Sequence, residues 1–272
     1  MSTQRMTLAP SRRSPVSILL AAFSITVLAI LFAPIVVIVV VSFSPGDIME
    51  FPPQGFSLRW YEAYVSNPMW MTATRISFLV ATLTAILSLV LGFMVSVALV
   101  RSSFPGKNAV RIFLMSPLII PKIIIAVGLY FLYVRMRILG TTFGLVAAHT
   151  LIAMPYVVMI ISAALYSFDR RLEWAARGLG ASPLSALRHV TFPMLRPAII
   201  SAALFAFIAS FDDIILSLFL TKLTAPTLPR QIWVNVQQII DPTIAAVSTL
   251  MTLISVLGLW LVALIQKLSS RG

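Results

Sequence analysis

The stretch EWAARGLGASPLSALRHVTFPMLRP, residues 173–197, lies between two long apolar runs. The chain of 272 residues is 60% hydrophobic and only 10% charged, whereas a soluble domain carries about 25% charged residues. A chain so poor in charge lacks the polar surface of a globule, so the composition indicates an integral membrane protein. In such a protein, the polar and basic 173–197 segment is expected to lie outside the lipid.

On either side of this segment, the sequence predicts an all-α membrane protein with six spans, each a run of roughly 20 apolar residues with few charges. Lipid offers no partner to backbone groups, so all six spans are predicted to be helices. They lie near 18–42, 76–100, 112–134, 143–167, 198–220 and 243–266. They make one transmembrane domain, 18–267, between tails 1–17 and 268–272, and the 168–197 loop joins the fourth span to the fifth.

The distribution of basic residues predicts the orientation. Six spans place both termini on one side, and that side carries 13 of the 20 lysines and arginines, against 6 on the other. Basic loops face the cytoplasm, so both termini and the 168–197 loop are predicted to be cytoplasmic. The net charge of +12 is therefore attributed to basic residues in cytoplasmic loops, and no nucleic-acid partner is expected. The chain has no cysteine, and no metal site is predicted.

The 168–197 loop is predicted to form two short helices. The first begins with apolar residues at helical spacing, and Gly178 and Gly180 weaken and end it; its apolar residues are Leu172, Ala175, Ala176 and Leu179. The second helix begins with Ser182 as N-cap and Pro183 as first residue. Pro193 and Pro197 are expected to close it before the fifth span.

Two readings of this hairpin are open from spacing alone. Its arginines could lie on anionic lipid headgroups. Alternatively, its two short helices could dock into the groove of a soluble partner protein.

The loop resembles the EAA loop of the inner-membrane permeases of binding-protein-dependent ABC importers. The family pattern is Glu-Ala-Ala, three residues, Gly, nine residues, a branched aliphatic residue, one residue, an apolar residue and Pro. The matching residues here are Ala175, Ala176, Gly180, Val190, Phe192 and Pro193. Trp174 occupies the family's Glu position, and Glu173 comes one residue earlier, so an ion pair made by the family's Glu is not carried over to this chain.

The resemblance implies a type I importer permease whose loop holds a coupling helix that docks on an ATP-binding subunit. The implied coupling residues are Glu173, Trp174, Ala175, Ala176, Gly180, Ser182, Pro183, Val190, Phe192 and Pro193. The implied partners are an ABC ATPase subunit in two copies, a second homologous permease, and an external solute-binding protein that docks on loops 43–75 and 221–242. The implied location is the bacterial inner membrane.

The chain has no G-x-x-x-x-G-K-[ST] motif, so it is not expected to bind ATP through a P-loop. No cofactor is expected on this chain, and ATP and Mg²⁺ are expected on the partner ATPase. The chain itself is not expected to be an enzyme.

Three further stretches resemble the second permease of spermidine/putrescine-type importers. They are HTLIAMPYVVMIISAAL (149–165), FDDIILSLFL (211–220) and TLPRQIWVNVQQIIDPTIAAVSTL (227–250). This resemblance implies a polyamine substrate. Related permeases carry other solutes, such as aminoethylphosphonate, so such a solute is the alternative.

Two adjacent acids, Asp212 and Asp213, interrupt the predicted fifth span. Charges inside a membrane face a cavity or a partner, and neighbours on a helix point about 100° apart. One aspartate is therefore expected to face the substrate pathway and attract a cation, and the other to pair within the bundle. The structural alternatives are pairing with Lys122 or Arg75, or a position near the outer end of the span that water reaches.

Two other classes of protein fit less well. An intramembrane aspartyl protease needs carboxylates from different elements, whereas these two acids are neighbours. His149 and His189 fall on opposite sides of the predicted topology, and His149 is expected to be structural. An ion-gradient-driven secondary transporter is the second rival, but the chain shows no internal repeat and that class gives the 168–197 loop no role.

Overall fold

The computed structural model describes residues 15–222, 225–238 and 241–269, and no β-strand occurs among them. The helices are α1 (Pro15–Val41), α2 (Arg59–Ser66), α3 (Pro68–Arg101), α4 (Lys107–Ile119), α5 (Lys122–Met136), α6 (Thr142–Ser167), α7 (Arg171–Gly178), α8 (Pro183–Ala186), the π-helical turn η1 (Leu187–Thr191), α9 (Phe192–Met194), α10 (Arg196–Phe211), α11 (Ile215–Leu220), α12 (Leu228–Gln238) and α13 (Thr243–Ser269).

Within the described residues, four helices, α1, α3, α6 and α13, are long and apolar enough to cross a membrane. Two bent helix pairs would raise the number to six if each pair is one span. The runs predicted near 18–42, 76–100, 143–167 and 243–266 fall on the four long helices. Most of the predicted N-terminal tail and the last three residues of the C-terminal tail lie outside the described residues.

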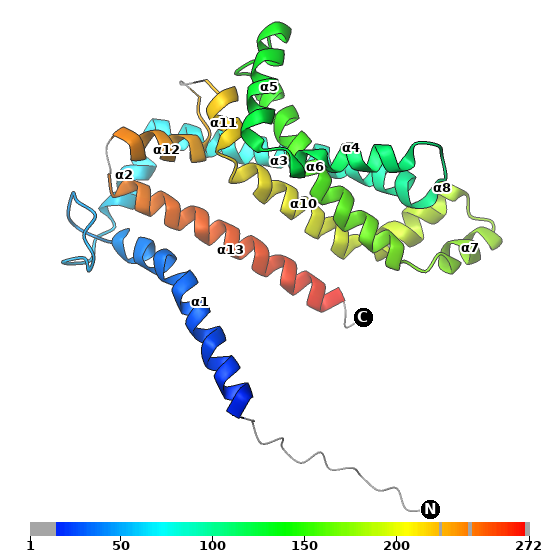
Figure 1. Ribbon diagram of the computed structural model, residues 1–272, viewed down its shortest axis with the longest axis horizontal. Coiled ribbons are helices and arrows are strands. Elements are labelled where there is room, and N and C mark those ends of the chain that lie inside the picture. The colour runs from blue at the N-terminus through cyan, green and yellow to red at the C-terminus, as the bar shows by residue number, and fades with distance from the viewer. Residues whose placement is uncertain (1–14, 223–224, 239–240, 270–272) are drawn as a thin grey trace, which may run out of the picture.

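The third predicted span, 112–134, is not one continuous helix as predicted. It is divided between α4 and α5, whose axes differ by 103°. Ile120 is extended, with φ −74° and ψ 130°, because a residue before proline is disfavoured in the helical region. Pro121 then caps the start of α5. A single proline therefore turns the chain through a right angle, and α5 projects from the bundle in Figure 1.

The fifth predicted span, 198–220, is also broken. Helix α10 ends at Phe211, and the chain leaves helical geometry before α11 begins at Ile215. The Asp213 carboxylate Oδ1 accepts a hydrogen bond from the Leu216 N–H at 2.8 Å. A short acidic side chain that bonds the backbone three residues ahead favours a helix start. The Asp213 side chain therefore stabilises the start of α11, at the point where the span is interrupted.

The core of the bundle is formed by α3, α6 and α10. Small residues of α3 lie against α6: Ala85 packs in the cluster that contains Val157, Gly92 faces Val157, and the Ser96 hydroxyl lies 3.3 Å from the Val158 carbonyl. A Cβ atom added to Gly92 would lie 2.6 Å from Cγ1 of Val157 on α6. The helices thus approach at a distance that only glycine permits, which is how helices associate in lipid.

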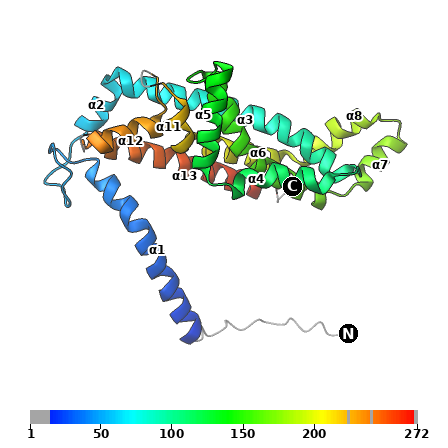
Figure 2. The same ribbon diagram turned by 45° about the horizontal axis from the view of Figure 1, so that its top comes forward.

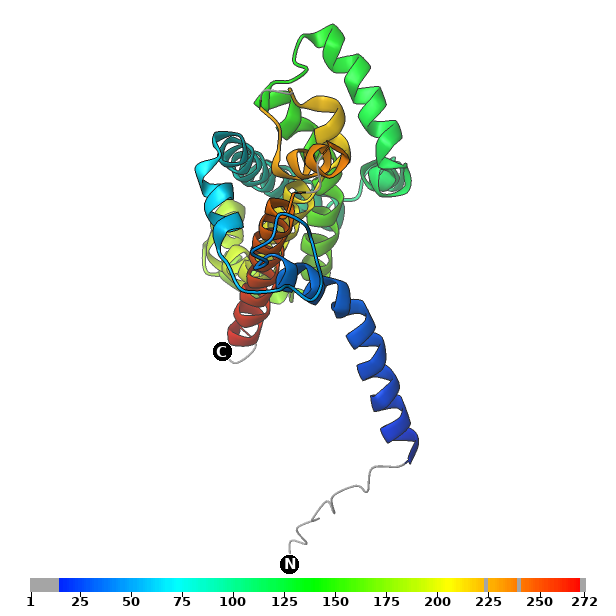
Figure 3. The same cartoon turned by 90° about the vertical axis from the view of Figure 1, so that its left-hand side faces the viewer.

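Helix α1 leaves the bundle and extends away from it (Figure 1 and Figure 3). Only 6% of its span is buried within this chain, against 67% for α6. Its apolar residues therefore face lipid or another subunit, since this chain does not cover them.

Helices α7 and α8 lie at one end of the elongated bundle, and α2 and α12 lie at the other (Figure 2). The loop that contains α7 and α8 is thus far from the segment that enters α13. The two ends are bridged by α3, which runs without a break for 34 residues.

Candidate functional site

The 168–197 loop folds as two short helices around a turn, as the sequence predicts. Helix α7 ends at Gly178, and Gly180 has a φ of 93°. The Ser182 hydroxyl then accepts a hydrogen bond from the Ser185 N–H at 3.2 Å, and Pro183 opens α8. The predicted N-cap and first helical residue are therefore confirmed.

The predicted end of the second helix is wrong. Pro193 does not close it but lies near the start of α9, and the chain remains nearly helical as far as α10. The Phe192 N–H bonds to the Leu187 carbonyl five residues back, so a π-helical turn precedes the proline. The wider turn accommodates the residue that has no N–H. The second loop helix consequently joins α10 directly, at a bend of 73°.

The tip of the loop presents apolar side chains to the surroundings. Leu179 is 91% exposed, Leu184 is 73% exposed and Trp174 is 61% exposed. The remaining predicted coupling residues divide into two sets: Ala175, Gly180, Ser182, Pro183 and Phe192 are exposed, and Ala176, Val190 and Pro193 are half-buried. We call the three exposed side chains Trp174, Leu179 and Leu184 the apolar tip.

Glu173 differs from the other predicted coupling residues because it is buried. Its Oε1 lies 2.6 Å from Nη2 of Arg101, the last residue of α3, and the two side chains are 10% and 17% exposed. The fully buried Thr191 hydroxyl donates to the same oxygen. Sequence reasoning missed Arg101 and Thr191, although Arg101 ends an uncharged run that begins after Arg75. The Glu173–Arg101–Thr191 contact ties α7 and η1 to α3.

Gly180 is expected to be essential for the loop's shape, whereas Gly178 is not. A Cβ atom on either glycine would meet nothing within 4 Å, but only Gly180 has a positive φ. Gly180→Ala should therefore strain the backbone by about 1 kcal/mol or more, while Gly178→Ala in a helix should be neutral or stabilising by about 1 kcal/mol. Thermal unfolding of the two purified variants checks this; equal midpoints would contradict the backbone argument.

A second polar cluster lies where α5, α6, α10 and α11 meet. The Asp213 Oδ2 accepts a hydrogen bond from the Lys122 ammonium at 2.8 Å, and the Asp213 side chain is 2% exposed. Of the alternatives open from sequence, Asp213 thus pairs with Lys122. His149 Nδ1 lies 2.7 Å from the Ser210 hydroxyl, and its buried Nε2 has no partner within the described residues. The cluster joins four helices.

Asp212 lies in a different environment from its neighbour. Its side chain is exposed and faces a groove of about 580 Å³ beside α12 and α13. Hydroxyl-bearing residues of α13 also line this groove, namely Ser248, Thr252 and Ser255. The structure thus separates the two aspartates, and sequence reasoning did not identify the three hydroxyl residues, whose spacing of four and three is that of one helix face.

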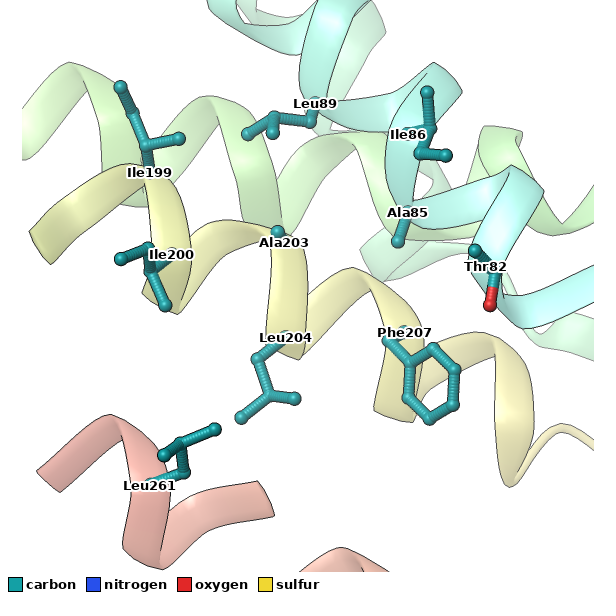
Figure 4. Close-up of a pocket in the computed structure, with 10 residues that line it drawn as sticks. All are labelled: Thr82, Ala85, Ile86, Leu89, Ile199, Ile200, Ala203, Leu204, Phe207 and Leu261. Carbon is teal, nitrogen blue, oxygen red and sulfur yellow. The ribbon is translucent and has the colours of Figure 1, made fainter. Parts of the chain in front are cut away.

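A further pocket, between α3, α10 and α13, has a volume of about 430 Å³. Figure 4 shows its lining side chains, in which Leu204 of α10 points toward Leu261 of α13. Thr82 contributes the one oxygen in this view, and no charged residue lines the pocket within the described part of the chain. Such a lining suits an acyl chain or an apolar helix rather than a polar solute.

The structure is a bundle of membrane-length helices with a two-helix loop at one end and a charge cluster where four helices meet. The chain belongs to the family of inner membrane components of binding-protein-dependent transport systems, whose sequence profile matches residues 88–271. It is therefore a permease subunit with the type I ABC importer fold, and an inner-membrane component.

Curated relatives and solved structures agree with this membership. The chain is 34% identical to the spermidine/putrescine transport system permease protein PotC of Haemophilus influenzae, over 92% of this chain and 96% of that one. It is 33% identical to the putrescine transport system permease protein PotI of Escherichia coli, over 89% and 87%. A bacterial ABC transporter involved in alginate import superposes with a TM-score of 0.74 at 15% identity, covering 96% and 99%, which shows the shared fold.

Proposed function

We propose that this chain is one permease of an ATP-driven importer that carries a polyamine across the inner membrane. An external binding protein delivers the solute, and a second, homologous permease completes the pathway. ATP and Mg²⁺ bind to a separate ATPase subunit, present in two copies, and this chain needs no cofactor of its own. The observation that carries this proposal is the apolar tip of the 168–197 loop.

The apolar tip is suited to a protein groove because three large side chains are exposed on two short helices. Leu179 and Leu184 would each gain about 2 kcal/mol from burial against a partner. Exposed Arg177 and Arg188 flank them and would pair with acidic residues around such a groove. With the loop on the ATPase, the loop and both termini are cytoplasmic, as the distribution of basic residues favours.

The polyamine assignment rests on the relatives and on the charge of the groove. Two relatives of about one-third identity are named for spermidine or putrescine transport. The exposed carboxylate of Asp212 attracts an ammonium group and repels an anion. This favours a polyamine over a phosphonate such as aminoethylphosphonate, whose net charge is less positive.

The docking role is tested with the variant Leu184→Glu. The side chain is 73% exposed, so the fold should tolerate the change, but the new carboxylate would be buried at the interface. When the tagged chain is co-expressed with its partner subunits, the ATPase recovered with it should fall about tenfold or more. Recovery of the second permease should be unchanged.

The matched control is Ile48→Glu. Ile48 is also exposed, at 69%, but lies between α1 and α2, outside the membrane-length helices and away from the loop, so ATPase recovery should be retained. Wild-type recovery in Leu184→Glu would contradict the docking role. The transport class is tested in proteoliposomes: uptake of putrescine that needs ATP supports the proposal, whereas uptake by the isolated chain on an ion gradient would assign a secondary transporter.

A further inference from the structure

The groove beside α13 contains a carboxylate that has no ion-pair partner among the described residues. Asp212 is the one charged side chain that lines it among the residues the structure describes. The ammonium of Lys122 is paired with Asp213 at 2.8 Å, and Asp212 has no ion pair or side-chain hydrogen bond in the described part of the chain. Two carboxylates and one ammonium leave a net charge of −1 at this point of the bundle.

Such a charge needs a compensating group. A lone carboxylate within the membrane domain costs about 3 kcal/mol when it faces lipid. The groove, of about 580 Å³, gives it access to water or to a ligand. A mobile cation in this groove would remove the imbalance that the protein leaves.

The α13 wall of the groove offers hydrogen-bond acceptors. Ser248, Thr252 and Ser255 line the groove from one face of α13. The Thr252 hydroxyl donates its proton to the Ser248 carbonyl at 2.8 Å, so the lone pairs of its oxygen remain for a donor in the groove. From Ser248 to Ser255 the row extends roughly 10 Å along the helix, which matches an extended chain rather than a compact ion.

Apolar side chains fill the spaces between these polar groups. Ile232 of α12 and Met251 and Val256 of α13 also line the groove. Methylene groups pack favourably on such side chains, and thioethers adapt to irregular chains. A ligand with charged ends and an aliphatic middle is complementary to this alternation.

We propose that this groove is the subsite for an extended aliphatic amine, with one ammonium group on Asp212 and the rest of the molecule along the hydroxyl row of α13. The inference rests on the proposed function and assigns the pathway role to Asp212 and a structural role to Asp213. The ammonium N–H groups donate to the carboxylate and to hydroxyl oxygens. The Lys122–Asp213 pair stays intact during binding.

The test uses the complete complex in proteoliposomes, with ATP-driven uptake of radiolabelled putrescine as the measurement. Asp212→Asn should lower uptake about tenfold or more, because a charge-assisted hydrogen bond is lost. Asp212→Glu keeps the carboxylate and should restore most of the uptake. ATPase stimulation by the binding protein should persist in Asp212→Asn, since that variant leaves the 168–197 loop unchanged.

The hydroxyl row is tested separately. Thr252→Val should lower uptake about fivefold, whereas Thr249→Val is the matched control, because Thr249 is a buried hydroxyl of α13 that does not line the groove. Wild-type uptake in both Asp212→Asn and Thr252→Val would refute the assignment of this groove as the amine subsite. The proposed function would not be affected. If the wild-type complex took up no aliphatic amine, the substrate assignment itself would fall.

Discussion

Reversing the charge at Glu173 is expected to abolish most ATP-driven uptake. In Glu173→Lys, two cations would face each other where Arg101 now pairs with Glu173 at 2.6 Å. Both side chains are less than one-fifth exposed, and breaking a buried pair costs about 3–5 kcal/mol. That is enough to detach α7 from the end of α3. Uptake and ATP hydrolysis by the reconstituted complex are the measurements, and hydrolysis should continue without transport.

A charge swap distinguishes a lost contact from a damaged loop. The double variant Arg101→Glu with Glu173→Arg should recover part of the uptake, because the pair is restored in reverse. Recovery should be incomplete, since the Thr191 hydroxyl now donates to the Glu173 carboxylate. Glu173→Lys with wild-type uptake would refute the role of the pair.

The matched control for this variant is the ion pair of Asp47 and Arg59. These side chains approach at 2.5 Å but are 79% and 48% exposed, and exposed pairs contribute at most about 1 kcal/mol. Asp47→Lys should therefore shift the thermal unfolding midpoint much less than Glu173→Lys does.

Neutralising Asp213 is expected to destabilise the bundle rather than to change specificity. Asp213→Asn removes the charge that holds Lys122 while leaving an oxygen that can still accept from the Leu216 N–H. An uncompensated ammonium costs about 3 kcal/mol in lipid. Because the Lys122 side chain is 40% exposed, we reduce the expected loss of stability to about 1–2 kcal/mol. Thermal unfolding of the purified complex is the measurement.

Two companion variants complete this test. Adding Lys122→Met to Asp213→Asn removes the stranded cation as well, and stability should return toward wild type. Asp212→Asn should leave the unfolding midpoint unchanged or raise it, since the variant removes a charge that has no ion-pair partner in the described part of the chain. Equal destabilisation by the two single aspartate variants would refute the separation of their roles.

Much of the fold can be predicted because lipid imposes simple requirements. Uncharged runs of about 20 residues must be helical in a membrane, and four of them coincide with α1, α3, α6 and α13. The start of α8 follows from the local preference of Ser182 and Pro183. These features depend on a few neighbouring residues, so the sequence alone is sufficient.

The breaks and the long-range contacts could not be predicted in the same way. Hydropathy predicts where a span lies but not where its helix breaks. It therefore does not predict the bend at Pro121, or the new helix start at Asp213 inside an apolar run. The Glu173–Arg101 pair joins residues 72 positions apart, and the family pattern assigns no role to the position of Glu173. Only the tertiary fold brings the two side chains together.

The uninterrupted course of α3 has a mechanical consequence. At 34 residues, the helix is about 51 Å long. As a rigid rod, it would carry a displacement of Arg101 at its C-terminal end along its whole length. A tilt of about 10° at that end displaces the Pro68 end by roughly 9 Å. The breaks between α4 and α5 and between α10 and α11 would allow these helices to change their relative angle when α3 tilts. If the loop docks as proposed, a displacement at the loop would be transmitted along α3 to the opposite end of the protein.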